Sequence, residues 1–238
     1  AGRTITSPFS NAGTLIGGNG LTFSQAFTNT GSYTQSAGTV SFAGGFTQTA
    51  GSFQLGTAGT PANAQVGAGG MQFVGGEFRG AGTVQGNVQL GNAALRVGYS
   101  PGALNITGDL TLSAGSVTDI EVGGTGAGQF DTINVSGTAA LAGTLNLLQF
   151  GGYTPVAGDT VAYLGHGASV GDFSTVNFVA PTNTWSLSRV LTATGQQLGA
   201  TAVPPAAVAA PTVAASVDPA VVAPSLQSLV ATPQNPPP

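Results

Sequence analysis

The stretch Phe27-Thr-Asn-Thr-Gly-Ser-Tyr33 is followed by a near copy of itself, Phe46-Thr-Gln-Thr-Ala-Gly-Ser-Phe53. The spacing from Phe27 to Phe46 is almost the same as the spacing from Tyr33 to Phe53. A repeat with a period of about 20 residues that is made of short strands is typical of a solenoid, in which successive coils stack in register. This repeat therefore predicts a β-solenoid.

Equivalent side chains of successive coils lie on top of one another in such a stack. We expect Phe27 to lie over Phe46 and Asn29 over Gln48, because aromatic and amide ladders stabilise stacked strands. The same repeat also allows an alternative fold, a β-sandwich or barrel with a duplicated hairpin.

Short segments in which apolar residues alternate with Thr, Ser, Gln or Asn run from the start of the chain to the region of Ala200. Period-two alternation that is bounded by glycine or asparagine predicts half-buried strands, and no helical period of useful length is present. The expected fold class is all-β, a parallel β-helix of roughly ten coils at about 20 residues per coil. The clearest of these segments are 39–42, 52–55, 87–90, 104–106, 110–112, 120–122, 133–135 and 145–147.

Two parts are expected along the chain, a β-solenoid over 1–202 and an extended tail over 203–238. The tail holds nine of the 14 prolines and a single charged residue, Asp218. Such a composition gives no reason for a separate core, and 225–230 is its one plausible docking segment. The chain opens at Ala1 without a basic and then apolar leader, as in a mature or processed product or a cytosolic protein.

The composition argues against several classes of function. Only 5% of the residues are charged, against roughly 25% in an average soluble domain. Four basic residues cannot neutralise a run of phosphates, so we expect no nucleic-acid partner. One histidine and no cysteine exclude zinc fingers, iron–sulfur clusters and disulfide scaffolds, and we expect no cofactor and no metal. No apolar run reaches the roughly 18 residues of a spanning helix, so the chain is not expected to be transmembrane.

A second pattern, made of Gly-Asp, Gly-Asn and Gly-Thr steps between short strands, extends over residues 80–200. It resembles the passenger regions of autotransporters and the filamentous-haemagglutinin-like exoproteins of two-partner secretion. The segments that carry the resemblance are 11–15, 80–88, 99–112, 120–122, 130–137, 142–145, 157–160 and 171–173.

This resemblance implies a right-handed β-helix that is exported across the outer membrane of a Gram-negative bacterium. We expect a secreted or cell-surface structural protein without enzymatic activity, an adhesin or a self-assembling filament subunit. The expected partners are further copies of the chain, joined head to tail with the tail docked on a neighbouring subunit, and a host or matrix glycan or protein. The alternative is a carbohydrate-binding or carbohydrate-active β-helix protein, which a groove with three clustered acids would favour.

Acidic side chains offer few candidates for chemistry. Asp119 and Glu121 alternate on one face of an expected strand, which places two carboxylates side by side. We interpret them as two solvated groups on the outer face, and we assign no catalytic, cofactor-binding or metal-binding residue. His166 lies between two glycines and is expected in an exposed loop. The acids beside turns are expected to cap corners of the solenoid, and they are Asp109, Asp131, Asp159 and Asp172.

The scarcity of charge leads to a prediction about salt. Stability should come from stacked apolar side chains and backbone ladders, so the melting temperature should change little between low and molar salt. Thermal unfolding followed by circular dichroism in dilute and in molar sodium chloride checks this. A melting temperature that collapses in molar salt would contradict it.

Overall fold

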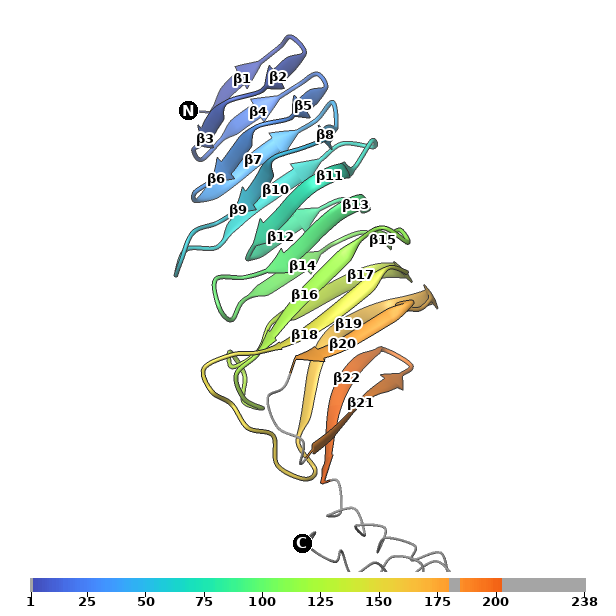
Figure 1. Cartoon of the computed structure of the whole chain (residues 1–238). Helices are drawn as coiled ribbons and strands as arrows, with labels where there is room; N and C mark the ends of the chain where they lie inside the picture. Colours follow the sequence, from blue (N-terminus) through green and yellow to red (C-terminus); the bar gives the residue numbers. More distant parts are fainter. Residues whose placement is uncertain (1, 180–184, 203–238) are drawn as a thin grey trace, which may run out of the picture. The chain divides into compact units, whose positions relative to one another are not determined.

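A computed structural model describes residues 2–179 and 185–202; the expected tail, with its docking segment 225–230, lies outside the described residues. The described part of the chain consists of 22 strands joined in one sheet (Figure 1). It contains no helix with the length and apolar character needed to cross a bilayer. The all-β prediction is therefore confirmed.

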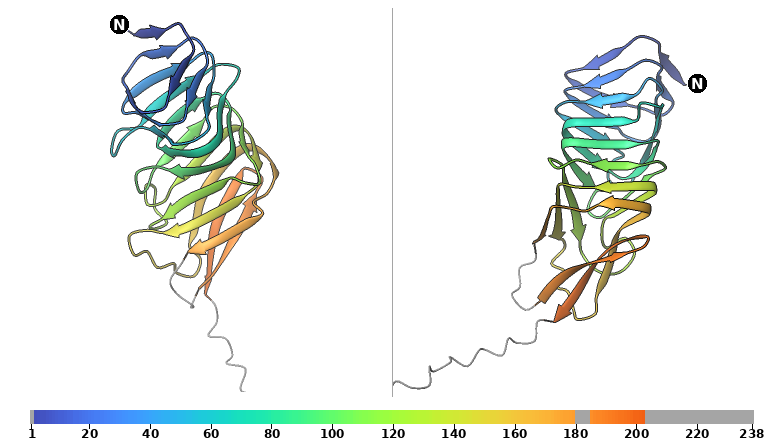
Figure 2. Two further views of the ribbon diagram at one scale, coloured as in Figure 1. Left: turned by 45° about the horizontal axis from the view of Figure 1, so that its top comes forward. Right: turned by 90° about the vertical axis from the view of Figure 1, so that its right-hand side faces the viewer.

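The strands of each coil join three parallel stacks, and the two views of Figure 2 show the coils one above another. The strands of the first stack are β1 (Arg3–Ile5), β4 (Leu21–Phe23), β7 (Gly38–Phe42), β10 (Ala62–Val66), β12 (Gly82–Gln85), β14 (Ala103–Ile106), and the first parts of β17 (Thr132–Leu141) and β19 (Thr160–Gly171).

The second stack is built from β2 (Phe9–Asn11), β5 (Phe27–Asn29), β8 (Phe46–Gln48), the first parts of β11 (Met71–Gly80) and β13 (Val88–Val97), β15 (Leu110–Leu112), and the second parts of β17 and β19. The third stack is built from β3 (Thr14–Gly17), β6 (Ser32–Gln35), β9 (Ser52–Leu55), the second parts of β11 and β13, β16 (Val117–Val122), β18 (Thr144–Gln149) and β20 (Thr175–Val179). All pairs within the three stacks are parallel, which makes the fold a β-solenoid rather than a sandwich of hairpins. The right-handed winding stays a prediction, in line with the general preference of parallel crossovers.

Eight coils, rather than roughly ten, fill the described residues, because the coils lengthen along the chain. In the first stack Leu21 pairs with Val40, whereas Val135 pairs with His166, which lies much further along the chain from its partner. The strands keep similar lengths while the corners between them grow. The count of roughly ten came from extending the short period of the first coils over the whole chain.

The core is a set of inward columns in which alternate side chains stack from coil to coil. The rings of Phe27 and Phe46 lie 5.4 Å apart at 16°, and those of Tyr33 and Phe53 lie 5.4 Å apart at 2°. All four rings are at most 1% exposed. The expected register of Phe27 over Phe46 and Tyr33 over Phe53 is confirmed.

An amide ladder runs beside the aromatic columns and is also buried. Asn11 Nδ2 donates to Asn29 Oδ1 at 2.8 Å, and Asn29 Nδ2 donates to Gln48 Oε1 at 3.0 Å. The same amide groups donate to corner carbonyls, as Asn29 does to Gly31 at 3.0 Å. Buried amides are stable only when they are hydrogen-bonded in this way. The expected stacking of Asn29 over Gln48 is therefore confirmed.

A hairpin follows the last coil. β21 (Trp185–Thr192) and β22 (Gly195–Ala202) are antiparallel, and β22 pairs antiparallel with the first part of β19. The parallel coils thus end at β20, and residues 185–202 cover one strand of the final coil instead of adding another coil. This pairing satisfies part of the strand edge that the last coil would otherwise expose.

Removing one aromatic ring from the inward columns should leave a cavity. We predict that Phe46→Ala lowers the free energy of unfolding by about 3–5 kcal/mol. The matched control is Thr47→Ala on the outward side of the same strand, which should cost less than about 1 kcal/mol. Urea unfolding followed by circular dichroism measures both values, and equal losses for the two variants would contradict the inward ladder.

Candidate functional site

The corners that join the third stack to the first differ greatly in length. Loops occupy 56–61, 98–102 and 123–131, whereas Ala81 alone separates β11 from β12. Gly80 and Gly82 make this tight corner possible. Their φ angles are +128° and +140°, and a Cβ on either would lie within 2.0 Å of a carbonyl oxygen of the preceding coil. The long loops therefore flank a coil with almost no corner of its own.

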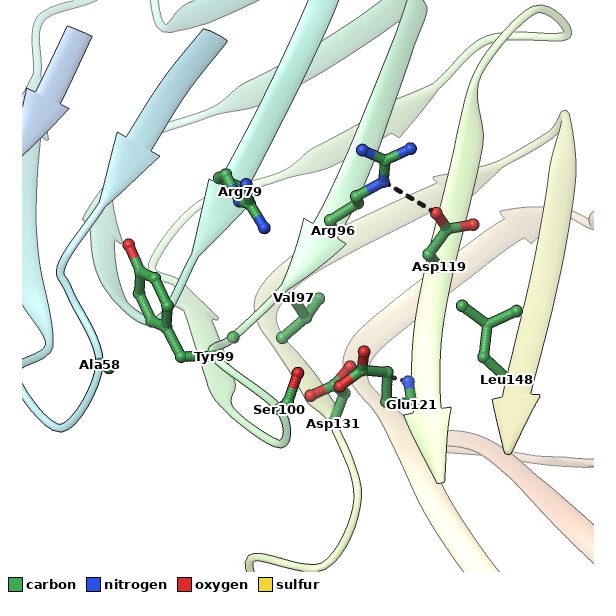
Figure 3. Close-up of a pocket in the computed structure, with 11 residues that line it drawn as sticks. Ala58, Arg79, Arg96, Val97, Tyr99, Ser100, Asp119, Glu121, Asp131 and Leu148 are labelled. Atoms are coloured by element: carbon green, nitrogen blue, oxygen red, sulfur yellow. Dashed lines mark hydrogen bonds and ion pairs between the residues drawn. The ribbon is translucent and has the colours of Figure 1, made fainter. Parts of the chain in front are cut away.

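A pocket of about 360 Å³ lies beside these loops, and we call it the charged pocket (Figure 3). This volume falls within the range of small-molecule sites, about 300–1,000 Å³. Its polar side chains come from β11, β13 and β16 and the loops after β13 and β16, and they are Arg79, Arg96, Tyr99, Ser100, Asp119, Glu121 and Asp131.

Ion pairs cross one wall of the charged pocket. Arg79, Arg96 and Asp119 are in register on three neighbouring strands. Arg96 Nε donates to Asp119 Oδ2 at 3.1 Å, and Arg96 Nη1 donates to Glu77 Oε2 at 2.7 Å. The hydrogen bond to Asp119 and the charge of Glu77 raise the pKa of Arg96. Because Arg96 is half exposed, these pairs orient side chains more than they stabilise the fold.

The outward column that contains Asp119 continues as a polar ladder into the following coils. Asn146 Nδ2 donates to Asp119 Oδ1 at 2.7 Å, and Asn177 Nδ2 donates to Asn146 Oδ1 at 2.8 Å. Both oxygens of Asp119 thus accept hydrogen bonds, one from Arg96 and one from Asn146. These two hydrogen bonds hold the Asp119 side chain in place, and each of its carboxylate oxygens already has a partner.

Two further carboxyl groups meet at the floor of the charged pocket. Asp131 is 1% exposed and accepts hydrogen bonds from the backbone N–H groups of Gly102 and Glu121, each at 2.7 Å. Burial, with a smaller contribution from the charge of Glu121, raises the pKa of Asp131 to about 7. Glu121 carries a buried carboxylate oxygen without a hydrogen-bond partner in the described part of the chain. Asp131 can therefore gain or lose a proton near neutral pH.

The structure brings Asp119 and Glu121 to the same face of β16, as their spacing predicted, and both line the charged pocket. They are half buried rather than solvated, which corrects the interpretation from the sequence. Asp131 joins them because the glycine-rich turn after β16 folds back and places its carboxyl on the Glu121 amide. The sequence analysis placed Asp131 at a corner and gave no sign that the turn brings it to Glu121.

The acids expected at corners do cap them. Asp109 accepts the N–H of Thr138, Asp159 that of Val156 and Asp172 that of Phe173, each at 2.8 Å. Asp131 does the same for Gly102 and Glu121. Corner capping is thus the shared role of these four side chains, and for Asp131 it coexists with a place in the pocket.

His166 is not in an exposed loop, contrary to expectation. It lies in β19, is 7% exposed, and occupies the inward column over Val135. A register shift between Ala162 and Leu164 changes which side chains of the strand face inward, so that Leu164 and His166 both point to the core. The flanking glycines belong to the strand and do not mark a turn.

The fold and its side-chain ladders define a parallel β-solenoid protein with a charged pocket on one corner. No family model matches the chain, and no curated protein sequence matches it.

Asp131 should make stability depend on pH. Because its native pKa of about 7 lies above the ordinary value of 3.8, the native state binds more protons than the unfolded state between these pH values. Stability should therefore fall as pH rises from about 4 to 7. Melting temperatures at pH 5 and pH 8 measure this difference.

Asp131→Asn should flatten this pH dependence, whereas Asp109→Asn, at an exposed corner cap, should preserve it. A wild-type melting temperature that is higher at pH 8 than at pH 5 would contradict the assignment. So would an undiminished pH dependence in Asp131→Asn.

Proposed function

We propose that this chain is a structural β-solenoid of the extracellular space or cell surface of a Gram-negative bacterium. In this proposal it acts as an adhesin or as the subunit of a homopolymeric filament, and residues 203–238 dock on a neighbouring subunit. The observation that carries the proposal is the stack itself, because three columns of parallel strands with inward ladders can be extended by any further coil in the same register.

The first coil offers both apolar and polar contacts to a further coil. Ile5, Phe9 and Leu15 are half buried and line an open cavity of about 460 Å³ over the core. The amide ladder also offers a contact to a further coil. Asn11 Nδ2 donates into the stack, and its Oδ1 accepts a 3.3 Å bond from the N–H of Gly13, which leaves capacity for another donor.

Open strand edges also support assembly. In the described part of the chain, β1, β2 and β3 each have a neighbour on one side, and such open edges template pairing with other strands. A head-to-tail contact that does not close yields a filament. The outward surface suits a structural role as well, because its side chains are mostly Thr, Ser, Asn and Gln rather than charged groups.

The experiment compares the full chain with two edge variants by sedimentation and negative-stain electron microscopy. Ile16 on β3 is 69% exposed, and Val74 within β11 is 54% exposed. Ile16→Lys should shift fibres or oligomers toward monomer, because lysine on an open edge opposes strand pairing. Val74→Lys, inside the stack, is the matched control and should leave assembly unchanged.

Deleting residues 203–238 should shorten or abolish the fibres if this segment connects subunits. Fibres that are unchanged by the deletion would contradict its docking role. A full-length chain that stays monomeric at every concentration would contradict the assembly proposal itself.

A carbohydrate-active role is the second candidate, and the three carboxyl groups of the charged pocket favour it. Cleavage of a polysaccharide by the chain, lost in Glu121→Gln and retained in Asp109→Asn, would support this candidate. Absence of cleavage across plant, fungal and bacterial polysaccharides would count against it.

A further inference from the structure

A second cavity lies on the other side of Tyr99, and we call it the neutral notch. Its volume is about 480 Å³, within the range of small-ligand sites. Loops 56–61 and 98–102 wall it on either side, and the tight corner at Ala81 forms its floor. The notch exists because the coil between the two long loops has almost no corner.

Polar groups are arranged along the notch at regular intervals. Asn63 on β10, Thr83 on β12 and Asn105 on β14 are in register and line the cavity. All three are half buried on the outward side of their strands. Successive coils are about 4.8 Å apart, so the three side chains present hydrogen-bond donors and acceptors in a row at that spacing.

Tyr99 places an aromatic ring beside the row, since it reaches from the loop before β14 to the loop before β10. Its phenol donates to the carbonyl of Gly56 at 2.5 Å and so ties the two flanking loops together. The hydrogen bond holds a ring with an apolar face against the cavity, next to Pro61 and Pro101. The protein's own hydrogen bond therefore fixes the position of the aromatic ring.

The lining residues narrow the class of ligand. Among the described residues that line the notch, none is charged and none is Leu, Ile, Val, Phe or Met. An ionic ligand would find no counter-charge, and the apolar side chains on offer are those of alanine, proline and one tyrosine. The lining strands are paired on both sides, so a peptide cannot add as a further strand.

We propose that the neutral notch binds a neutral oligosaccharide. Sugar hydroxyl groups would exchange hydrogen bonds with Asn63, Thr83 and Asn105, while the apolar face of one sugar ring would pack on Tyr99. This site goes beyond the structural role proposed above and does not depend on assembly, so it can be tested on the chain in its monomeric fraction.

The test uses a glycan array with neutral gluco-, manno- and galacto-oligosaccharides beside uronic, sialylated and sulfated ones, followed by calorimetry on the best ligand. We expect binding to neutral glycans, weakened about tenfold by Tyr99→Ala and by Thr83→Val, since each loses interactions of roughly 1–1.5 kcal/mol. Thr83→Val keeps the shape of the side chain, which separates loss of binding from loss of fold.

Asn177→Ala is the matched control, because Asn177 is an outward amide on β20, on the third stack rather than the first. It should bind as the wild type does. Binding to anionic glycans alone, binding to a peptide alone, binding unaffected by both notch variants, or no binding to any glycan would each overturn the proposal.

Discussion

In the parallel coils that the structure describes, inward side chains stack on their register partners in the neighbouring coil, with the strands about 4.8 Å apart. The rest of the structure depends on this constraint. It holds Phe27 against Phe46 with nearly parallel rings, and it lets Asn29 pass a hydrogen bond to Gln48 inside the core. A shift of one residue would turn an entire strand inside out. The strands are therefore held in register from coil to coil, and the corners are where the chain is free to vary.

The corners are accordingly where candidate sites occur. The loops 56–61 and 98–102 are long, whereas the corner at Ala81 between them is short. This difference in length leaves two cavities, and Tyr99 lines both of them. One is charged and contains a carboxyl group, Asp131, that titrates near neutral pH. The other is lined by uncharged groups. A fold with very few charges has thus gathered five of its 12 charged residues, the side chains Arg79, Arg96, Asp119, Glu121 and Asp131, around one pocket.

The repeat of residues 27–53 was enough to predict the solenoid and the partners of its first aromatic rings, because period and alternation are both local. Three features escaped prediction for physical reasons. The alternation of residues within strands does not reveal how long the corners between strands are, so roughly ten coils were predicted where the structure has eight. Asp131 reaches Glu121 only through the fold of a turn, which sequence spacing does not reveal. His166 faces inward because of a register shift within β19, an irregularity that side-chain alternation alone cannot place.

Cross-linking tests the register most directly, because the chain contains no cysteine. Ser32 and Ser52 are paired outward residues whose Oγ atoms lie 3.3 Å apart. The double variant Ser32→Cys with Ser52→Cys should oxidise to a disulfide, seen by mass spectrometry as a loss of two hydrogens. The control, Ser32→Cys with Gln54→Cys, places the second thiol two residues out of register and should stay reduced. Equal cross-linking of the two pairs, or cross-linking of the control alone, would contradict the stacked register.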